Sequence, residues 1–141
     1  MNVYADTSFF VSLYTRDIHS AAALALMTLK PNLWLTPLHI AEFSHAIAQQ
    51  VFFGRASSAD ADQIYDDLHR DRKKILWLEV SIPDHAFELC ADLARKYGPK
   101  LGVRTLDSLH VACALELKAD RFWTFDERQA RLAKAQGLKT S

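Results

Sequence analysis

Short apolar runs alternate along the chain with longer segments in which apolar residues recur at helical spacing. The short runs predict strands and the longer segments predict helices. This alternation favours an α/β domain with a mainly parallel sheet. The predicted strands are Asn2–Ala5, Leu33–Thr36, Ile75–Val80 and Arg121–Phe125. The predicted helices are Ser8–Tyr14, His19–Leu29, Pro37–Phe53, Ser57–Arg72, Pro83–Tyr97, Thr105–Lys118 and Glu127–Gln136.

Glycine and proline mark several of the predicted helix ends. Gly54 ends the helix that begins at Pro37. The pair Gly98–Pro99 predicts a stop for the helix that begins at Pro83. No linker, repeat or low-complexity segment interrupts the chain, so we expect a single domain over residues 1–141. The last four residues are expected either to add a short edge strand or to fray.

The composition is that of a chain with a compact core. Of the 141 residues, 50% are hydrophobic and 24% are charged, and folding at this size buries roughly 68% of the unfolded surface. The formal net charge is zero, from 17 basic and 17 acidic residues. Nucleic-acid binding usually leaves a basic footprint. Clustered carboxylates would offset a local basic stripe, however, so the net charge does not exclude this class.

The cysteines and the apolar runs indicate the compartment. Cys90 and Cys113 each lie in an apolar segment predicted to be helical, and neither belongs to a Cys-x-x-Cys motif. We therefore expect buried, reduced thiols in a reducing compartment. The N-terminus shows no signal peptide pattern, and the longest nearly apolar run, Ala21–Leu29, is too short to span a bilayer. These features favour a cytoplasmic protein.

Three acidic residues occupy positions where functional groups gather in parallel sheets. Asp6 and Asp126 each follow a predicted strand, and Asp107 lies in the first turn of a predicted helix. Such positions meet outside the carboxyl ends of the strands. Glu42 lies about one turn into the helix after the second strand and can face the same edge. We therefore expect four carboxylates in one site.

A cluster of carboxylates needs a counter-ion. Two carboxylates about 4 Å apart repel by roughly 1 kcal/mol in water and about 4 kcal/mol at an effective dielectric of 20. Oxygen ligands favour hard cations, which near a phosphate substrate are Mg²⁺ or Mn²⁺. The chemistry expected of such a site is metal-assisted phosphodiester hydrolysis, with one or two ions.

Each acid also has a purely structural interpretation. Asp6 can cap the helix that follows it, and Asp126 with Gln129 matches a capping pattern. Asp107 can be a first-turn acid stabilised by the helix dipole. Glu42 shares a helix face with His39, His45 and Gln49, as expected of a solvated polar stripe. The combination of all four acids favours the functional interpretation.

Three motifs in order resemble the PIN domain family, and most closely its VapC-type toxins. They are MNVYADTSFFVSLY, then LTPLHIAEFSHAI, then LGVRTLDSLHVACALELKADRFWTFDERQARLAKAQGL. The resemblance covers essentially the whole chain. It implies that Asp6, Glu42, Asp107 and Asp126 are the catalytic acids that hold Mg²⁺ or Mn²⁺. It also implies that the Ser8 and Thr124 hydroxyls support them.

The same resemblance implies a fold and partners. The fold is a three-layer α/β/α sandwich with a mainly parallel sheet of four to five strands. The activity is that of an endoribonuclease toxin, a homodimer that cleaves single-stranded or loop RNA. A cognate antitoxin inhibits the toxin, and contact with DNA is expected only through the antitoxin. No membrane association is expected.

Other polar and aromatic residues are candidates for supporting roles. Arg104 precedes the helix of Asp107 and is a candidate for RNA phosphate contact, whereas a basic cluster at residues 70–74 is interpreted as solvated surface. His110 follows Asp107 by three residues and could form a metal pair with it, or serve packing or hydrogen bonding. The remaining histidines lack zinc-ligand spacing. The three tryptophans are interpreted as core residues.

Two other function classes remain open at this level. A housekeeping PIN-domain nuclease that processes RNA would carry the same four acids. A binding module for RNA or protein would need no turnover, although the intact acidic set disfavours it. A phosphatase of the haloacid-dehalogenase type needs a second Asp two residues after the first, and that position is Ser8.

Overall fold

The five strands of this protein form one parallel sheet. The structure is a computed structural model that describes residues 1–141. Its strand order is β3-β2-β1-β4-β5, and every neighbouring pair is parallel. The strands are β1 (Asn2–Ala5), β2 (Asn32–Leu35), β3 (Leu78–Glu79), β4 (Arg121–Trp123) and β5 (Lys139–Thr140). The last of these confirms the edge strand expected at the C-terminus.

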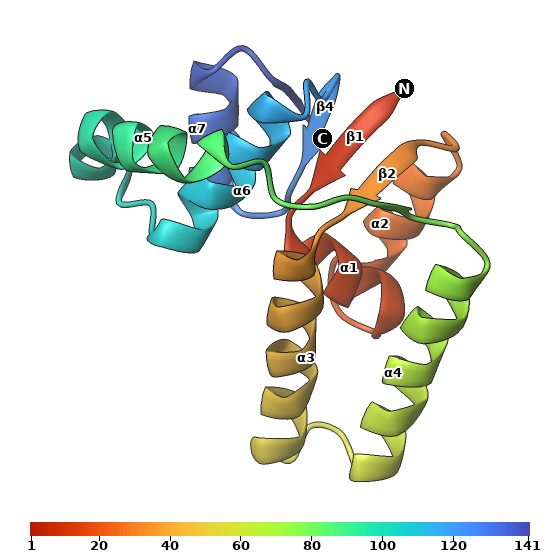
Figure 1. The fold of residues 1–141 in the computed structure, drawn as a ribbon. Coiled ribbons are helices and arrows are strands. Elements are labelled where there is room, and N and C mark those ends of the chain that lie inside the picture. The colour runs from red at the N-terminus through yellow and green to blue at the C-terminus, as the bar shows by residue number, and fades with distance from the viewer.

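Seven helices cover the two faces of this sheet. Figure 1 shows α5, α6 and α7 grouped on one side of β1 and β4, and α1 and α2 on the other side. Helices α3 and α4 extend from the sheet as a long hairpin joined at its far end (Figure 1). The helices are α1 (Thr7–Tyr14), α2 (Ser20–Met27), α3 (Pro37–Phe52), α4 (Ser58–Lys73), α5 (His85–Leu101), α6 (Thr105–Glu116) and α7 (Glu127–Ala135). None of them has the length and hydropathy needed to cross a membrane.

The sheet divides the apolar core into two halves. Successive side chains of a strand point to opposite faces. Val3 and Ala5 accordingly join the core beneath α1–α4, whereas Tyr4 joins the core beneath α5–α7. In β4, Trp123 and Phe122 divide in the same way. The expected three-layer α/β/α arrangement with a parallel sheet is therefore confirmed.

The predicted strand at Ile75–Val80 is wrong over its first half. Ile75 adopts a φ of 56° in the left-handed region, and its N–H donates to the Arg72 carbonyl at 3.0 Å. The next N–H, of Leu76, donates to the Asp71 carbonyl at 3.1 Å. These bonds cap the C-terminus of α4 in a Schellman-type motif. Carbonyls left unpaired at the helix end therefore take the N–H groups that a longer strand would use.

The predicted helix stop at Gly98–Pro99 is also wrong. Helix α5 continues through Pro99 to Leu101 and ends at Gly102, which has a φ of 64°. A proline inside a helix removes one backbone hydrogen bond and crowds the preceding turn. Here Tyr97 and Leu101 pack against the core beneath α5–α7 on both sides of it. This apolar packing holds the last turn in place.

The predictions for cysteine and tryptophan fare better. Cys90 and Cys113 are buried free thiols, as expected. Trp77 and Trp123 are buried in the core, whereas Trp34 is only half-buried.

Candidate active site

The four predicted acids meet at one cavity beyond the carboxyl ends of β1, β2 and β4. The cavity has a volume of about 230 Å³ and no hydrophobic residue in its lining. The loops after β1 and β4, the residue before α6 and the first two turns of α1, α3, α6 and α7 supply its side chains. They are Asp6, Thr7, Ser8, Glu42, Arg104, Asp107, His110, Asp126 and Gln129.

Asp6 is the most deeply buried of the four acids, at 2% exposure. Its Oδ1 accepts hydrogen bonds from the Ser8 hydroxyl at 2.7 Å and from the Phe9 N–H at 3.1 Å. Its Oδ2 accepts one from the Thr124 hydroxyl at 2.8 Å. Burial raises the pKa of Asp6 above its ordinary value, although these hydrogen bonds lower it in part. Asp6 thus caps α1, as its structural interpretation predicts, and also faces the cavity.

Glu42 is held by a chain of hydrogen bonds that crosses the sheet end. Its Oε1 accepts from the Thr7 hydroxyl at 2.7 Å and from His110 Nε2. The Tyr4 hydroxyl donates to Nδ1 of the same imidazole at 2.9 Å. Burial alone would raise the pKa of Glu42, but His110 and Thr7 hold it below its ordinary value. Glu42 is therefore an ionised carboxylate with its Oε2 left free toward the cavity.

The two histidines nearest the site both have structural partners. His110 contacts Glu42 rather than Asp107, so the structure does not form the pair that the spacing of Asp107 and His110 allows. His39 is fully buried, which corrects the interpretation of Glu42 and His39 as one solvated stripe. Its Nε2 donates to the Ala5 carbonyl at 2.8 Å. Sequence spacing alone could not show that His39 and His110 are buried, because a helix face is buried only where another element covers it.

Asp107 and Asp126 face the cavity from opposite helix N-termini. Oδ2 of Asp107 accepts from the Arg104 N–H at 3.0 Å and lies 3.9 Å from the Arg104 guanidinium. Oδ1 of Asp126 accepts from the Arg128 N–H at 2.8 Å, and its Oδ2 lies 3.7 Å from the Arg128 guanidinium. Both carboxylates therefore cap helices, and each has an arginine guanidinium within 4 Å.

Gln129 is a site residue that the sequence indicated only as a capping partner of Asp126. Its side-chain amide N donates to Asp6 Oδ2 and to Asp107 Oδ1, each at 3.2 Å. It does not return to the Asp126 N–H as a capping pattern would require, because Thr124 accepts that N–H at 3.0 Å. Gln129 is buried, and its Oε1 has no hydrogen-bond partner. The amide places positive hydrogens between two carboxylates that would otherwise repel.

The donor set suits a hard divalent cation. The carboxylates offer only oxygen, and two of these oxygens, Glu42 Oε2 and Asp126 Oδ2, accept no hydrogen bond. No three acidic, histidine or cysteine side chains lie close enough to share one ion in this conformation. Mg²⁺ typically takes one or two protein carboxylates and keeps several waters. The residues therefore fit Mg²⁺ or Mn²⁺ in a hydrated site better than a closed protein cage.

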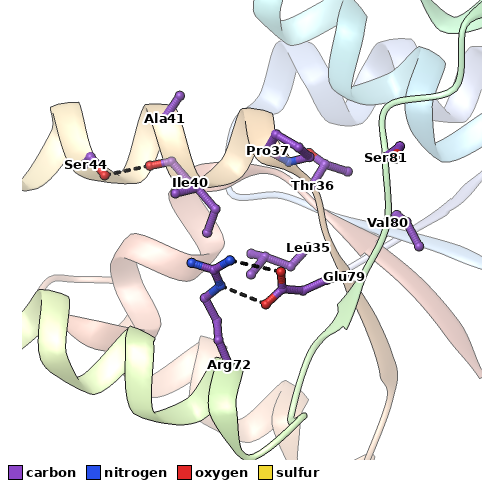
Figure 2. Close-up of a pocket in the computed structure, with 10 residues that line it drawn as sticks. All are labelled: Leu35, Thr36, Pro37, Ile40, Ala41, Ser44, Arg72, Glu79, Val80 and Ser81. Atoms are coloured by element: carbon purple, nitrogen blue, oxygen red, sulfur yellow. Dashed lines mark hydrogen bonds and ion pairs between the residues drawn. The ribbon is translucent and has the colours of Figure 1, made fainter.

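A larger cavity lies away from these acids. Its volume is about 570 Å³, and it lies between the first turns of α3, the end of α4 and the segment after β3. Figure 2 shows Arg72 reaching across it to Glu79, with hydrogen bonds of 2.8 and 2.9 Å. This ion pair engages Arg72 alone, whereas Arg70, Lys73 and Lys74 are exposed, as expected of solvated surface. No candidate acid lines the cavity.

Comparison with known proteins assigns the family. The sequence matches the PIN domain family over residues 3–135. The chain belongs to the PIN domain family. No curated protein matches this PIN domain in sequence.

Solved structures share the fold of this PIN domain at low sequence identity. One is VapC20 of Mycobacterium tuberculosis, a toxin that cleaves the sarcin-ricin loop, with a TM-score of 0.72 and 14% identity over 92% of this chain and 94% of that chain. VapBC2 of Rickettsia felis, bound to a DNA fragment from its promoter, has a TM-score of 0.69 and 14% identity, over 100% of this chain and 98% of that chain. FitAcB of Neisseria gonorrhoeae has a TM-score of 0.65 and 15% identity, over 98% of this chain and 95% of that chain.

Proposed function

We propose that this PIN domain is a Mg²⁺- or Mn²⁺-dependent endoribonuclease that acts as the toxin of a toxin–antitoxin pair. The observation that carries the proposal is the polar cavity into which four carboxylates project from four separate elements. Family membership and the likeness to VapC20 support it. Divalent ions of this kind catalyse phosphodiester hydrolysis in many nucleases and phosphatases.

The proposal gives the chain's own residues distinct tasks. Glu42, held by His110 and Thr7, presents an ionised oxygen to the cavity. Asp6, fixed by Ser8 and Thr124, cannot turn away from it. A bound ion would lower the pKa of a coordinated water and stabilise charge on the phosphate. At the rim, the Arg104 side chain is 80% exposed and free to reach a phosphate of the RNA backbone.

Cleavage assays with matched variants test the activity. We expect the purified protein to cleave RNA when Mg²⁺ or Mn²⁺ is present and to stop when EDTA is added. Asp107→Asn and Glu42→Gln should lower the rate by more than about 100-fold, since even outer partners of metal ligands contribute 10–100-fold. Asp92→Asn is the control, because Asp92 is an exposed acid that pairs only with Arg95. Equal rates for Asp107→Asn and the parent would refute the assignment.

The proposed toxin role is supported by the likeness in fold to VapC20, a toxin, and to VapBC2, which is bound to a fragment of its promoter DNA. We propose that a cognate antitoxin binds this chain and blocks its site, that DNA is reached only through the antitoxin, and that the toxin is a homodimer. Expression of the chain in bacteria should arrest growth, whereas the Asp107→Asn variant should not. Co-expression of the antitoxin should restore growth. Growth arrest that is equal for parent and variant would favour a role other than RNA cleavage, and light scattering would establish the oligomeric state.

A further inference from the structure

A second recess opens directly beside the acidic cavity. It has a volume of about 320 Å³ and lies between α1, the loop before α2 and the start of α3. Thr7, Ser8 and Glu42 line both spaces, so the two are adjacent. The volume lies at the lower end of the range for small-molecule sites, about 300–1,000 Å³. A ligand group attached to whatever occupies the acidic cavity would therefore reach this recess.

His19 lines the recess and belongs to a stacked aromatic platform whose other rings, Phe125 and Phe9, lie outside the lining. The ring of His19 lies parallel to that of Phe125, with centroids 4.5 Å apart and an interplanar angle of 4°. Phe125 in turn stacks on the buried Phe9 at 6.0 Å and 17°. The three rings form a column anchored in the core. Phe125 lies between Thr124 and Asp126, so the column is joined to the loop that carries a site acid.

A fixed carboxylate stands beside the platform. Oδ2 of Asp17 accepts from the Ser12 hydroxyl at 2.8 Å, and Oδ1 accepts from the His19 N–H at 2.8 Å and the Ser20 hydroxyl at 3.2 Å. Slight burial works in the opposite direction, but these bonds hold the pKa of Asp17 below its ordinary value. A carboxylate offers about four acceptor positions. Three are used, so the ionised group retains one position for an N–H donor.

The chemistry of the recess favours a nucleobase over a phosphate. Both charged carboxylates that line it, Asp17 and Glu42, repel phosphate. A base is neutral, has a π-face for stacking and carries N–H groups on its edge. We propose that this recess binds the base next to the scissile phosphate of an RNA substrate, with its face on His19 and an N–H donated to Asp17. This inference rests on the proposed ribonuclease function.

Single-stranded RNA oligonucleotides of about 12 nucleotides, within the range that single-strand binding sites accommodate, test the subsite. Once a cleavage site is mapped, the base on each side of it is replaced in turn by an abasic ribose. In the parent, one of these two replacements should lower kcat/KM by about 5- to 150-fold, the effect of losing one stacked base. In His19→Ala the same replacement should have little further effect. His19→Phe should restore the sensitivity.

Matched controls separate the subsite from the rest of the machinery. His85→Ala removes an exposed histidine of α5 far from the recess and should behave as the parent does. Asp17→Asn should weaken cleavage of intact RNA and leave cleavage of the abasic RNA unchanged. Mn²⁺ binding, measured by calorimetry, should be the same in the parent and His19→Ala. An equal abasic penalty in the parent and His19→Ala would overturn the subsite.

Binding measurements distinguish failure of the subsite from failure of the proposed function. Fluorescence anisotropy with the Asp107→Asn variant reports oligonucleotide binding without cleavage. A parent that binds RNA through His19 yet cleaves none would refute the ribonuclease and retain only base binding in the recess. A parent that cleaves RNA with no dependence on His19 would support the ribonuclease and refute the subsite. A parent that neither binds nor cleaves RNA would overturn both.

Discussion

His39 should make the stability of this protein fall sharply under mildly acidic conditions. Its Nδ1 accepts the Thr36 N–H at 2.9 Å, so the ring is neutral with its proton on Nε2. Protonation of His39 Nδ1 would place its N–H against the Thr36 N–H. Burial, followed by the nearby His110, lowers the pKa of His39 to about 3. The hydrogen bond to Ala5 and the charge of Glu42 oppose this shift only in part.

The sign and size of the effect follow from the two states. In the unfolded chain His39 titrates near its ordinary pKa of about 6.5, so the unfolded chain binds the proton more tightly. The stabilisation is fully present above pH 6.5 and is lost as the pH falls from 6.5 toward 3. With a folded pKa of about 3, the free energy of unfolding should fall by about 2 kcal/mol between about pH 7.5 and about pH 5.0. Ordinary carboxylates titrate below this window, and Asp6, whose pKa burial raises, affects the parent and a His39 variant alike.

Urea unfolding at these two pH values measures the effect. His39→Gln keeps one acceptor and one donor but cannot titrate, so its stability should change less than that of the parent by about 2 kcal/mol. His85→Gln, at an exposed position on α5, should retain the full dependence of the parent. The imidazole resonances of His39 should show no titration above about pH 5. Equal pH dependence for the parent and His39→Gln would refute the reasoning.

Two further predictions concern buried polar groups. Gln129→Met removes the amide between Asp6 and Asp107. Without divalent ions, this change should lower the free energy of unfolding by about 1–3 kcal/mol. The loss should be smaller in excess Mn²⁺, and equal losses in both conditions would contradict the bridging role. Burial raises the pKa of Cys113 to about 11, so its thiol should react with a disulfide reagent at about pH 8 only after unfolding. Labelling of Cys113 in the folded protein at the rate of an exposed thiol would contradict this protection by burial.

The sequence by itself determined the order of strands and helices and three of the four acid positions. Alternating apolar periods specify the elements because a strand and a helix bury their side chains with different repeats. Asp6, Asp107 and Asp126 could be placed at the sheet edge because parallel strands all end on the same side. Glu42 came from the family pattern, since its own helix face also matches a solvated stripe.

Only the tertiary structure decided which polar groups contact one another. Gln129 bridges Asp6 and Asp107, which lie 123 and 22 residues away from it in sequence, and His110 contacts Glu42 rather than the nearer Asp107. No local pattern encodes these pairs, because they depend on how α3, α6 and α7 pack around the ends of β1 and β4. Packing between elements also extends α5 beyond Gly98–Pro99 to Leu101 and buries His39. Local propensities are worth a few kcal/mol at most, and apolar packing between elements can override them.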